Sequence, residues 1–301
     1  MCGSSDSPLE AVTLGDSPQE AVDPTAIRTA LNADAASVRQ RGARVCKIVS
    51  EDDVDTVRPF VSELGRLLSD ENPGVVQTAT SALTEIATAD TTAVVDVLDD
   101  VVALGDAELG SVQLSAAQLL RTVANQDPTH CSSVVDVLLD RLLRPPEVGS
   151  DDQSVATHIE DRVTSRVVQQ HEREEQQHEQ VARHIFANIA VAVAETEPSA
   201  LTDHIETVAD LTAVEDVVVR GAALDILGPL CRDDPSKVEP FGDVIAACLD
   251  TDVSVLEARA IRTLGFLGDA QYADVLREVA ATESDEEIAA FAEETAAHLE
   301  S

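Results

Sequence analysis

A pattern of small and apolar residues repeats along this chain at intervals of 37 residues, and it constrains the fold more than any other feature. Each copy begins with an apolar residue, often followed by arginine, and continues with two pairs of small or apolar residues at helical spacing. We call this pattern the comb. A unit of this length accommodates two helices and a turn, so the comb predicts a chain of helical hairpins. Copies of the comb begin at Val38, Val75, Val112, Val219 and Leu256.

One interval between combs is too long. Val112 and Val219 are 107 residues apart, which equals two repeats plus 33 further residues. If the extra residues precede the comb, the missing copy begins at Ala182, and Arg183 then occupies the same slot as Arg39 and Arg220. The sequence therefore predicts an insertion at about residues 147–180, within the fourth hairpin.

The segments before the combs complete the hairpins. They are amphipathic at helical spacing, and no run along the chain shows sustained strand alternation, so the prediction is an all-α fold. A hairpin of this kind buries its apolar faces only by stacking on its neighbours. Arg39, Arg183 and Arg220 are expected to hydrogen-bond to the turns or carbonyl groups of neighbouring hairpins, which is a structural role. The segments cover residues 54–68, 93–104, 131–143, 201–213, 237–249 and 273–281.

The comb and the acidic or asparagine-containing turns before it (residues 69–74, 215–216 and 250–252) resemble HEAT repeats, in particular the short bacterial and archaeal kind. The resemblance covers residues 24–300. It implies a right-handed α-solenoid, an α-α superhelix of about seven hairpins with one long inserted helix. It also implies a non-enzymatic scaffold or adaptor that binds another protein along the face of successive comb helices.

Two other functions stay open at this point. One is a HEAT-like enzyme or enzyme subunit similar to the bilin lyases or to an iron hydroxylase. The other is an accessory subunit similar to the HEAT subunits of chromosome-organising complexes.

The charge of the chain limits the partners it can have. It carries 57 acidic and 20 basic residues, for a net charge of −37, and Lys47 and Lys237 are its only lysines. This composition resembles proteins of salt-in halophilic archaea, whose molar salt shortens the Debye length to about 3 Å and screens carboxylate repulsion. So acidic a surface repels phosphate backbones and anionic lipids, and we expect neither nucleic acid nor a membrane as partner.

The sequence also indicates a reducing, cytoplasmic location. It contains no membrane-length apolar run, and its first 20 residues lack the basic and apolar parts of a secretory signal. Cys2, Cys46, Cys131, Cys231 and Cys248 are dispersed and show no C-x-x-C spacing, so they are interpreted as reduced thiols.

The first 23 residues differ from the repeats. Residues 6–12 recur almost unchanged at residues 16–22, in a stretch rich in Ser, Asp and Pro. We expect a flexible acidic tail.

The insertion is a candidate partner-binding element. Residues 153–197 contain neither Gly nor Pro, which favours one long helix. Val155, Ile159, Val163 and Val167 recur every fourth residue and would form a narrow apolar stripe. The stripe is a possible docking surface for a partner or for a second copy of the chain, although folding back onto the solenoid would bury it equally well. Residues 169–180 are polar on all sides and predict a solvated helical segment.

Histidines in the insertion do not predict a metal site. His171 and His178 would lie about 10.5 Å apart along one helix, too far for one ion to bind both. The two His-Glu pairs are similar to the iron-binding dyads of deoxyhypusine hydroxylase, but those dyads lie on different hairpins, whereas these share one helix. The chain shows no phosphate-binding loop, nucleophile elbow or dinucleotide fingerprint. We therefore predict no catalytic residue, metal or cofactor.

Overall fold

The computed structural model describes residues 23–146 and 162–301, and every regular element in those ranges is an α-helix or a 3-10 helix. Residues 1–22 of the predicted tail lie outside the described residues, as do Val155 and Ile159 of the stripe. The chain forms two compact units: residues 1–130 with 146–185, and residues 131–145 with 186–301. None of the described helices is long and apolar enough to cross a membrane.

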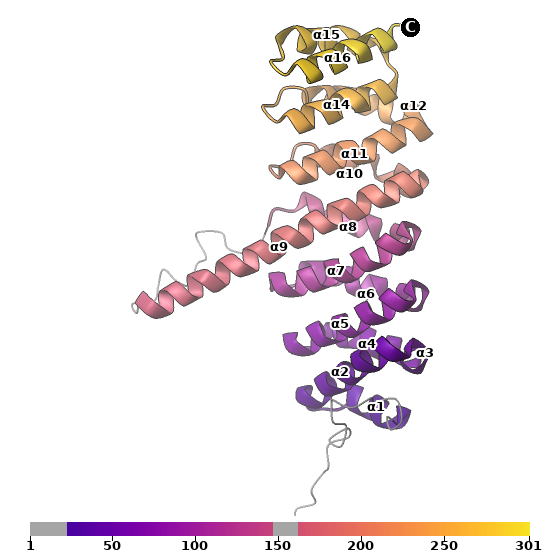
Figure 1. Ribbon diagram of the computed structural model, residues 1–301, viewed down its shortest axis with the longest axis vertical. Helices are drawn as coiled ribbons and strands as arrows, with labels where there is room; N and C mark the ends of the chain where they lie inside the picture. The colour runs from indigo at the N-terminus through magenta and orange to yellow at the C-terminus, as the bar shows by residue number, and fades with distance from the viewer. Residues whose placement is uncertain (1–22, 147–161) are drawn as a thin grey trace, which may run out of the picture. The chain divides into compact units, whose positions relative to one another are not determined.

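In the first unit, α2, α5 and α7 lie side by side in one layer, and the shorter α1, α4 and α6 form a second layer (Figure 1). The elements of this unit are α1 (Pro24–Leu31), α2 (Ala36–Asp52), α3 (Val54–Val57), η2 (Arg58–Phe60), α4 (Val61–Arg66), η3 (Leu67–Ser69), α5 (Pro73–Ala89), η4 (Thr91–Val97), α6 (Leu98–Ala103), η5 (Leu104–Asp106), α7 (Gly110–Gln126) and the first part of α9 (Arg162–Thr196).

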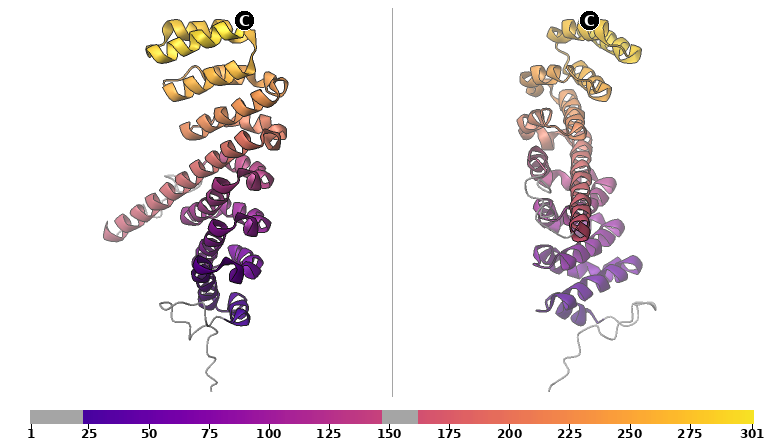
Figure 2. Two further views of the ribbon diagram at one scale, coloured as in Figure 1. Left: turned by 45° about the vertical axis from the view of Figure 1, so that its right-hand side comes forward. Right: turned by 90° about the vertical axis from the view of Figure 1, so that its left-hand side faces the viewer.

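In the second unit, α11, α14 and α16 lie side by side, with α10, α13 and α15 behind them (Figure 2). Its elements are most of η6 (Pro128–Val134), α8 (Val135–Leu143), the last part of α9, η9 (Pro198–His204), α10 (Ile205–Leu211), α11 (Val217–Asp233), α12 (Pro235–Val238), η10 (Glu239–Phe241), α13 (Gly242–Ala247), α14 (Ser254–Leu267), η11 (Ala270–Tyr272), α15 (Ala273–Thr282) and α16 (Glu286–Leu299).

The comb residues form the core of both units. In α2, α5, α7, α9, α11 and α14, the two pairs of small or apolar comb residues are all buried. The small side chains bring helices together: a Cβ at Gly42 would lie 3.1 Å from the Cβ of Ala30 and from the backbone nitrogen of Leu31. Each buried apolar side chain stabilises the stack by about 25 cal/mol per Å² removed from water. The prediction of stacked helical hairpins is therefore confirmed.

The first helix of each hairpin is less regular than predicted. Residues 54–68 and 237–249 were expected as single helices, but each is divided into short α and 3-10 turns. Pro59 and Pro240 lie within the 3-10 turns η2 and η10. Proline has no N–H to donate to the carbonyl group four residues earlier, so the helical hydrogen-bond ladder is interrupted at both positions.

Aspartates at the repeat interval cap these first helices. Asp53, Asp90 and Asp127 are 37 residues apart, and Asp234 occupies the equivalent position in the second unit. Each side chain accepts a hydrogen bond from the backbone N–H two residues later, with N···O distances of 3.0 to 3.2 Å. A carboxylate at this end of a helix also interacts favourably with the helix dipole. Part of the acidic charge therefore has a local structural role that composition alone did not reveal.

Arg39 connects successive hairpins of the first unit. Its Nε and Nη2 atoms donate to the two carboxylate oxygens of Asp70, at 2.6 and 2.9 Å. Its Nη1 atom donates to the carbonyl oxygens of Ala33 and Asp34, at 2.9 and 2.6 Å. Hydrogen bonding to Arg39 holds the pKa of the Asp70 carboxyl below its usual value. The guanidinium thus joins the turn of its own hairpin to the turn of the next.

The same comb slot contacts a nearby turn in other repeats. Arg220 donates from Nε to the carbonyl oxygen of Thr212 at 3.2 Å, and Gln113 donates from Nε2 to that of Ala107 at 2.7 Å. Arg183 is buried in α9. Arg39, Gln113 and Arg220 therefore each reach the backbone of a turn from this slot.

Replacing Arg39 tests this connection. Arg39→Met keeps the length and apolar stem of the side chain but removes both the carboxylate and the carbonyl contacts, and it leaves Asp70, whose side chain is 5% exposed, without its cation. We expect a loss of about 1 to 3 kcal/mol in the free energy of unfolding, measured by denaturant titration.

Arg44→Met is the matched control, since Arg44 is exposed on the same helix. It should change the free energy of unfolding by no more than about 0.5 kcal/mol. Equal effects of the two substitutions would contradict the role assigned to Arg39.

Candidate functional site

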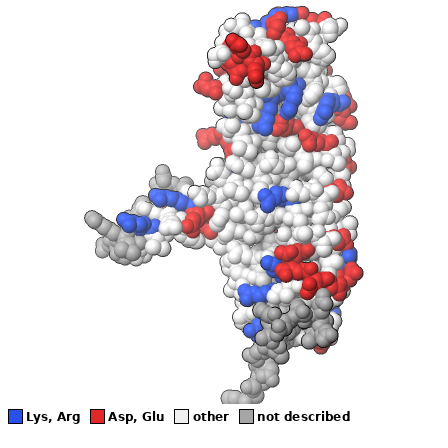
Figure 3. Space-filling view, in the orientation of Figure 1, with Lys and Arg blue, Asp and Glu red and all other residues white. Residues whose placement is uncertain are grey.

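Arginine side chains gather on the outward side of α11 and α14, in a chain whose charge is otherwise strongly acidic (Figure 3). Arg232 lies on α11, and Arg259 and Arg262 lie on α14. Asp225 of α11 is bound by both arginines of α14: Arg262 Nη2 lies 2.5 Å from Oδ1, and Arg259 Nε lies 3.1 Å from Oδ2. Two guanidinium groups thus share one carboxylate.

Arg232 has an aromatic neighbour instead of a carboxylate. Its guanidinium carbon lies 5.0 Å from the centre of the Phe266 ring, within cation–π distance. No ion pair of Arg232 is present within the described part of the chain. An exposed contact of this kind contributes only about 0.5 to 1 kcal/mol. The guanidinium is therefore held in place loosely and keeps its hydrogen-bond donors available.

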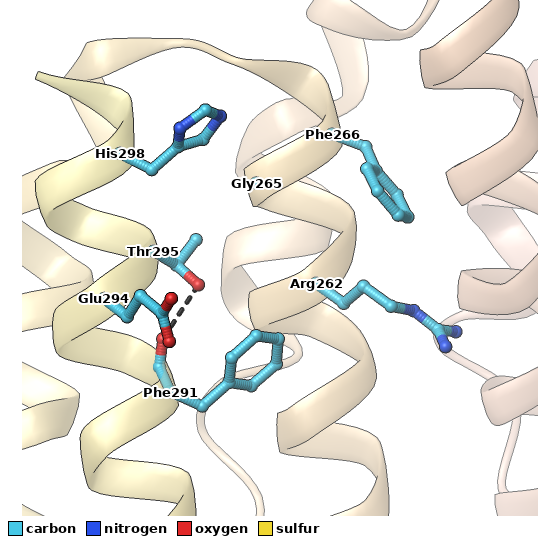
Figure 4. Close-up of a pocket in the computed structure, with 7 residues that line it drawn as sticks. All are labelled: Arg262, Gly265, Phe266, Phe291, Glu294, Thr295 and His298. Atoms are coloured by element: carbon cyan, nitrogen blue, oxygen red, sulfur yellow. Dashed lines mark hydrogen bonds between the residues drawn. The ribbon is translucent and has the colours of Figure 1, made fainter. Parts of the chain in front are cut away.

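Two adjoining hollows lie along this face. One, of about 270 Å³, lies between α14 and α16 (Figure 4), and the other, of about 310 Å³, extends across α11 to the end of α9. Both are lined by Arg262 and Phe266, so we describe them together as the arginine–phenylalanine groove. The first is also lined by Gly265, Phe291, Glu294, Thr295 and His298, and the second by Val191, Glu195, Asp225, Gly228 and Arg232.

The side chains of the groove come from facing helices. Phe291 and His298 point from α16 toward α14, whereas Arg262 and Phe266 point away from α16 (Figure 4). The two phenylalanines keep 38% and 36% of their surface exposed, which is unusual in a chain with only five phenylalanines. Sequence reasoning missed this site because the comb identifies buried slots and assigns no role to the outward positions between them.

Glycines leave room for the rings. A Cβ at Gly228 would lie 3.4 Å from Cδ2 of Phe266, so the ring rests directly over the α11 backbone there. A Cβ at Gly265 would lie 3.1 Å from Cγ2 of Thr295. The small residues at these two positions allow α14 to approach its neighbours closely on both sides.

In the first unit, two of the three helices of the equivalent layer, α5 and α7, are nearly uncharged. Glu85 is the only charged residue of α5, and Arg121 is the only one of α7. A hydrogen bond of 3.2 Å from Gln77 Nε2 to Ser111 Oγ joins the two helices. This face therefore offers few groups that could anchor a ligand.

The structure does not bring the four stripe residues together as a described surface. Val163 lies in α9 without a described side chain, and Val167 of the same helix is 62% exposed. The neighbouring side chains of Thr164, Arg166 and His171 are exposed as well. The described side chains at positions 164, 166, 167 and 171 of α9 are therefore exposed, and docking on the stripe stays a prediction.

The expectation of a fully solvated segment at residues 169–180 is wrong on one face. Glu175 and Glu179 are buried against the start of α7, at 8% and 2% exposure. Oε2 of Glu175 accepts a hydrogen bond of 2.9 Å from the backbone N–H of Ser111 and so caps α7, whose own N-cap residue provides no side-chain bond. Gly110 has no side chain at the point where the α9 backbone passes, and a Cβ there would collide with the carbonyl oxygen of Glu175.

A sequence signal for this contact exists in retrospect. Residues 175, 179, 182 and 186 follow one another at intervals of four, three and four, which places them on one face of a helix. Glu175 and Glu179 therefore continue the buried face of α9 toward its start. They are polar because they meet the N-terminus of a helix rather than an apolar side chain.

The histidines of the insertion do not converge on one point. His178 Nδ1 lies 3.8 Å from Oε1 of Glu175, and His171 is exposed one helical turn or more away. Within residues 23–146 and 162–301, no three His, Cys, Asp or Glu side chains are placed so that they could hold a metal ion.

A different chemistry occupies the comb slot of α14. Glu257 stands in the slot that holds arginine or glutamine in α2, α7, α9 and α11, and it is only 4% exposed. It lines a polar hollow of about 330 Å³ together with Asp250, Asp252 and Glu283. Burial, followed by the hydrogen bond and the negative charge of Glu283, raises the pKa of Glu257 to about 7. The same hydrogen bond helps to lower the pKa of Glu283, so a protonated Glu257 donates to the carboxylate of Glu283.

Comparison with known proteins identifies the family. The family model described as the adaptin N terminal region matches residues 24–276 of the chain. The chain belongs to this family. No curated protein matches the adaptin-family chain described here.

Solved structures show the fold of this family member. A HEAT-like repeats protein from the archaeon Thermococcus onnurineus NA1 is 11% identical, with a TM-score of 0.53 over 93% of this chain and 98% of that one. Computationally designed armadillo repeat proteins give 14% identity and a TM-score of 0.53 over 81% and 98%. A designed armadillo repeat protein in complex with the peptide (KR)4 gives 15% identity and a TM-score of 0.50 over 81% and 98%. The predicted all-α solenoid of HEAT-like repeats is therefore confirmed.

The buried glutamate of α14 makes stability depend on pH. Because the pKa of Glu257 rises from 4.5 to about 7 on folding, its contribution is fully present below pH 4.5 and is lost as the pH rises through 7. Glu257→Gln stays neutral, so we expect it to exceed the wild type by about 1 to 2 kcal/mol in free energy of unfolding near pH 8. The difference should vanish near pH 4.5, as measured by chemical denaturation across the range.

Glu278→Gln, which alters an exposed residue of α15, is the control and should show no such pH-dependent difference. A constant offset between wild type and Glu257→Gln at every pH would contradict the assignment.

Proposed function

We propose that this chain is a non-enzymatic scaffold that binds another protein in the arginine–phenylalanine groove of the second unit. The observation that carries the proposal is the meeting of Arg232, Arg262, Phe266 and Phe291 in two adjoining hollows. Arginine and aromatic side chains supply most hot spots of protein interfaces. Elsewhere the chain has few aromatic residues and an acidic surface, so the groove concentrates what a protein partner would use.

The fold supports this use. Repeat arrays commonly bind partners along the face of successive helices. The designed armadillo repeat protein with the (KR)4 peptide has the same fold and is itself in complex with a peptide. The proposal extends a peptide-binding role of this kind to the present chain.

The net charge of −37 defines the setting of the proposal. It disfavours nucleic acid and anionic membranes as partners. The scarcity of lysine in the chain supports a saline cytoplasm of the haloarchaeal type. The described cysteines support a reducing compartment, since Cys46, Cys131, Cys231 and Cys248 are all free and buried.

A second contact surface is proposed on the first turns of α9. Val167 is 62% exposed there, and Val163 precedes it by one helical turn. An apolar stripe on an exposed helix favours pairing with the same stripe on a second copy of the chain, since an isologous contact buries both.

The groove is tested by removing its aromatic anchors. We expect the double variant Phe266→Ala/Phe291→Ala to lose a crosslinked partner that the wild type retains in native lysate. The reason is that the hollow loses both of the aromatic rings that line it. Crosslinking mass spectrometry measures this loss. Truncating two hot-spot aromatics typically costs at least about 2 kcal/mol in binding.

Val244→Ala is the control, since Val244 is 38% exposed on α13, in the other layer of the same unit. A partner retained equally by wild type, Val244→Ala and the double variant would argue against the groove.

The α9 surface is tested by charge insertion. We expect Val163→Glu/Val167→Glu to convert a dimer to a monomer in sedimentation velocity, because two like-charged stripes repel each other. Gln170→Glu, on an exposed position of the same helix, adds charge outside the stripe and should leave the dimer intact. A wild-type chain that stays monomeric at all concentrations would refute this contact.

A further inference from the structure

We propose that a proton, held by Glu257 against Glu283, keeps the hairpin of α15 and α16 docked on α14, and that loss of this proton releases the hairpin. Release would also remove one wall of the hollow between α14 and α16. The release itself is independent of the proposed function, whereas its effect on partner binding rests on that function.

The two carboxyl groups come from different elements. Glu257 lies in the first turn of α14 and is only 4% exposed, whereas Glu283 ends α15, where the chain turns toward α16. The hydrogen bond between them therefore spans the contact between α14 and the hairpin. Ionised carboxylates only accept hydrogen bonds, so this bond exists only while Glu257 carries its proton.

Glu283 is fixed to the start of α16. Its Oε1 atom accepts hydrogen bonds from the backbone N–H of Asp285 at 2.7 Å and from the hydroxyl of Ser284 at 3.2 Å. Asp285 in turn caps α16, because its Oδ1 atom accepts from the backbone N–H of Glu287 at 2.9 Å. A hydrogen bond to Glu283 is thus connected to the N-terminus of α16.

The surroundings of Glu257 are acidic. The hollow of about 330 Å³ that it lines is also lined by Asp250 and Asp252 from the turn before α14, by Glu283, and otherwise by uncharged residues. Asp285 adds negative charge from the turn between α15 and α16. Among the described residues, no lysine, arginine or histidine lines this hollow, and none of α11, α12, α13 and α16, the helices that pack on α14, contributes to it. An ionised Glu257 would therefore be buried among like charges, and release of the hairpin relieves this cost.

The pKa values give the direction of the effect. Burial, and then the hydrogen bond and charge of Glu283, raise the pKa of Glu257 to about 7, while the backbone N–H of Asp285 lowers the pKa of Glu283. When the hairpin is released, Glu257 meets water and its pKa returns toward 4.5. The docked form therefore binds one more proton between these values, and docking weakens as the pH rises from 4.5 to about 7.

The hairpin is placed so that it can open by itself. α15 and α16 pack on each other at one end of the second unit (Figure 2), and α14 is the comb helix that α16 contacts. Repeats in a stack are held by contacts with their neighbours. The hairpin can therefore detach while α11 and α14 stay folded, as a local opening below the global free energy of unfolding.

Release would dismantle part of the arginine–phenylalanine groove. Phe266 lines the hollow of about 270 Å³ from α14, whereas Phe291 and His298 line it from α16 (Figure 4). Without α16 this hollow loses one side. A partner that binds there and a proton on Glu257 favour the same docked state, so each strengthens the binding of the other.

The experiment is amide hydrogen exchange on the full-length chain between about pH 5.5 and 7.5, in about 1 M KCl. Burial is the largest cause of the raised pKa, so the effect should persist in salt that screens the surface charges. Protection factors, which remove the intrinsic pH dependence of exchange, are compared for α16 and α11. We expect α16 to be less protected than α11 throughout, and its protection to fall by about tenfold or more across this range.

Variants assign the proton. Glu257→Gln keeps a donor for Glu283 at every pH, so the protection of α16 should no longer fall. Glu283→Gln still accepts from the N–H of Asp285 through its amide oxygen but lacks the charge that disfavours an ionised Glu257, so the fall should move to lower pH. Glu278→Gln, at an exposed position of α15, is the control and should behave as the wild type.

The link to binding has its own measurement. Crosslinking of the wild type in native lysate should recover less of its groove partner at pH 7.5 than at pH 5.5, and Glu257→Gln should recover equal amounts at both.

Different results would overturn different parts. Equal protection of α16 and α11, or a pH-dependent fall that persists in Glu257→Gln, would refute release of the hairpin by this proton. If α16 opens as expected but recovery of the partner does not depend on pH, the link between the proton and the groove is refuted. If no partner depends on Phe266 and Phe291, the proposed function fails, while opening of the hairpin still stands on the exchange data.

Discussion

The packing of one hairpin against the next is the interaction on which the rest of the structure depends. No single hairpin of this chain buries its own apolar residues, because each comb places two pairs of small or apolar side chains on a face that only a neighbouring helix covers. The small residues among them set how closely the helices approach. Folding of each unit is thus a sum of similar contacts between adjacent repeats, and turns, caps and surface grooves follow from their spacing.

Polar groups complete the contact between repeats. Asp53 and its equivalents cap the first helix of a hairpin, and Arg39 joins its own turn to the carboxylate of the next. The slot is adaptable: glutamine reaches a carbonyl group in α7, whereas Glu257 in α14 faces another carboxyl group. Local exchanges in one slot therefore change stability and its pH dependence without changing the fold.

The groove arises because the comb leaves some positions of each helix free. Residues such as Arg232, Phe266 and Phe291 point outward between buried slots, so packing does not dictate their identity. Basic residues number only 20 in this chain, and three arginines lie where α11 and α14 are side by side. The family match and the solved structures establish the fold, and the identity of these outward side chains is the basis of the proposed binding function.

The sequence by itself determined the repeat, the all-α class and the buried face of each comb helix, because these depend on periodicities within one helix or one repeat. Only the tertiary structure decided that Glu175 caps α7, 64 residues earlier in the chain, and that the side chains of the groove share two hollows. It also showed that Pro59 and Pro240 interrupt the first helices of their hairpins. Contacts between residues distant in sequence depend on how the helices stack. The periodicity of one helix predicts its own buried face and does not predict which outward side chains of a neighbouring helix it will meet.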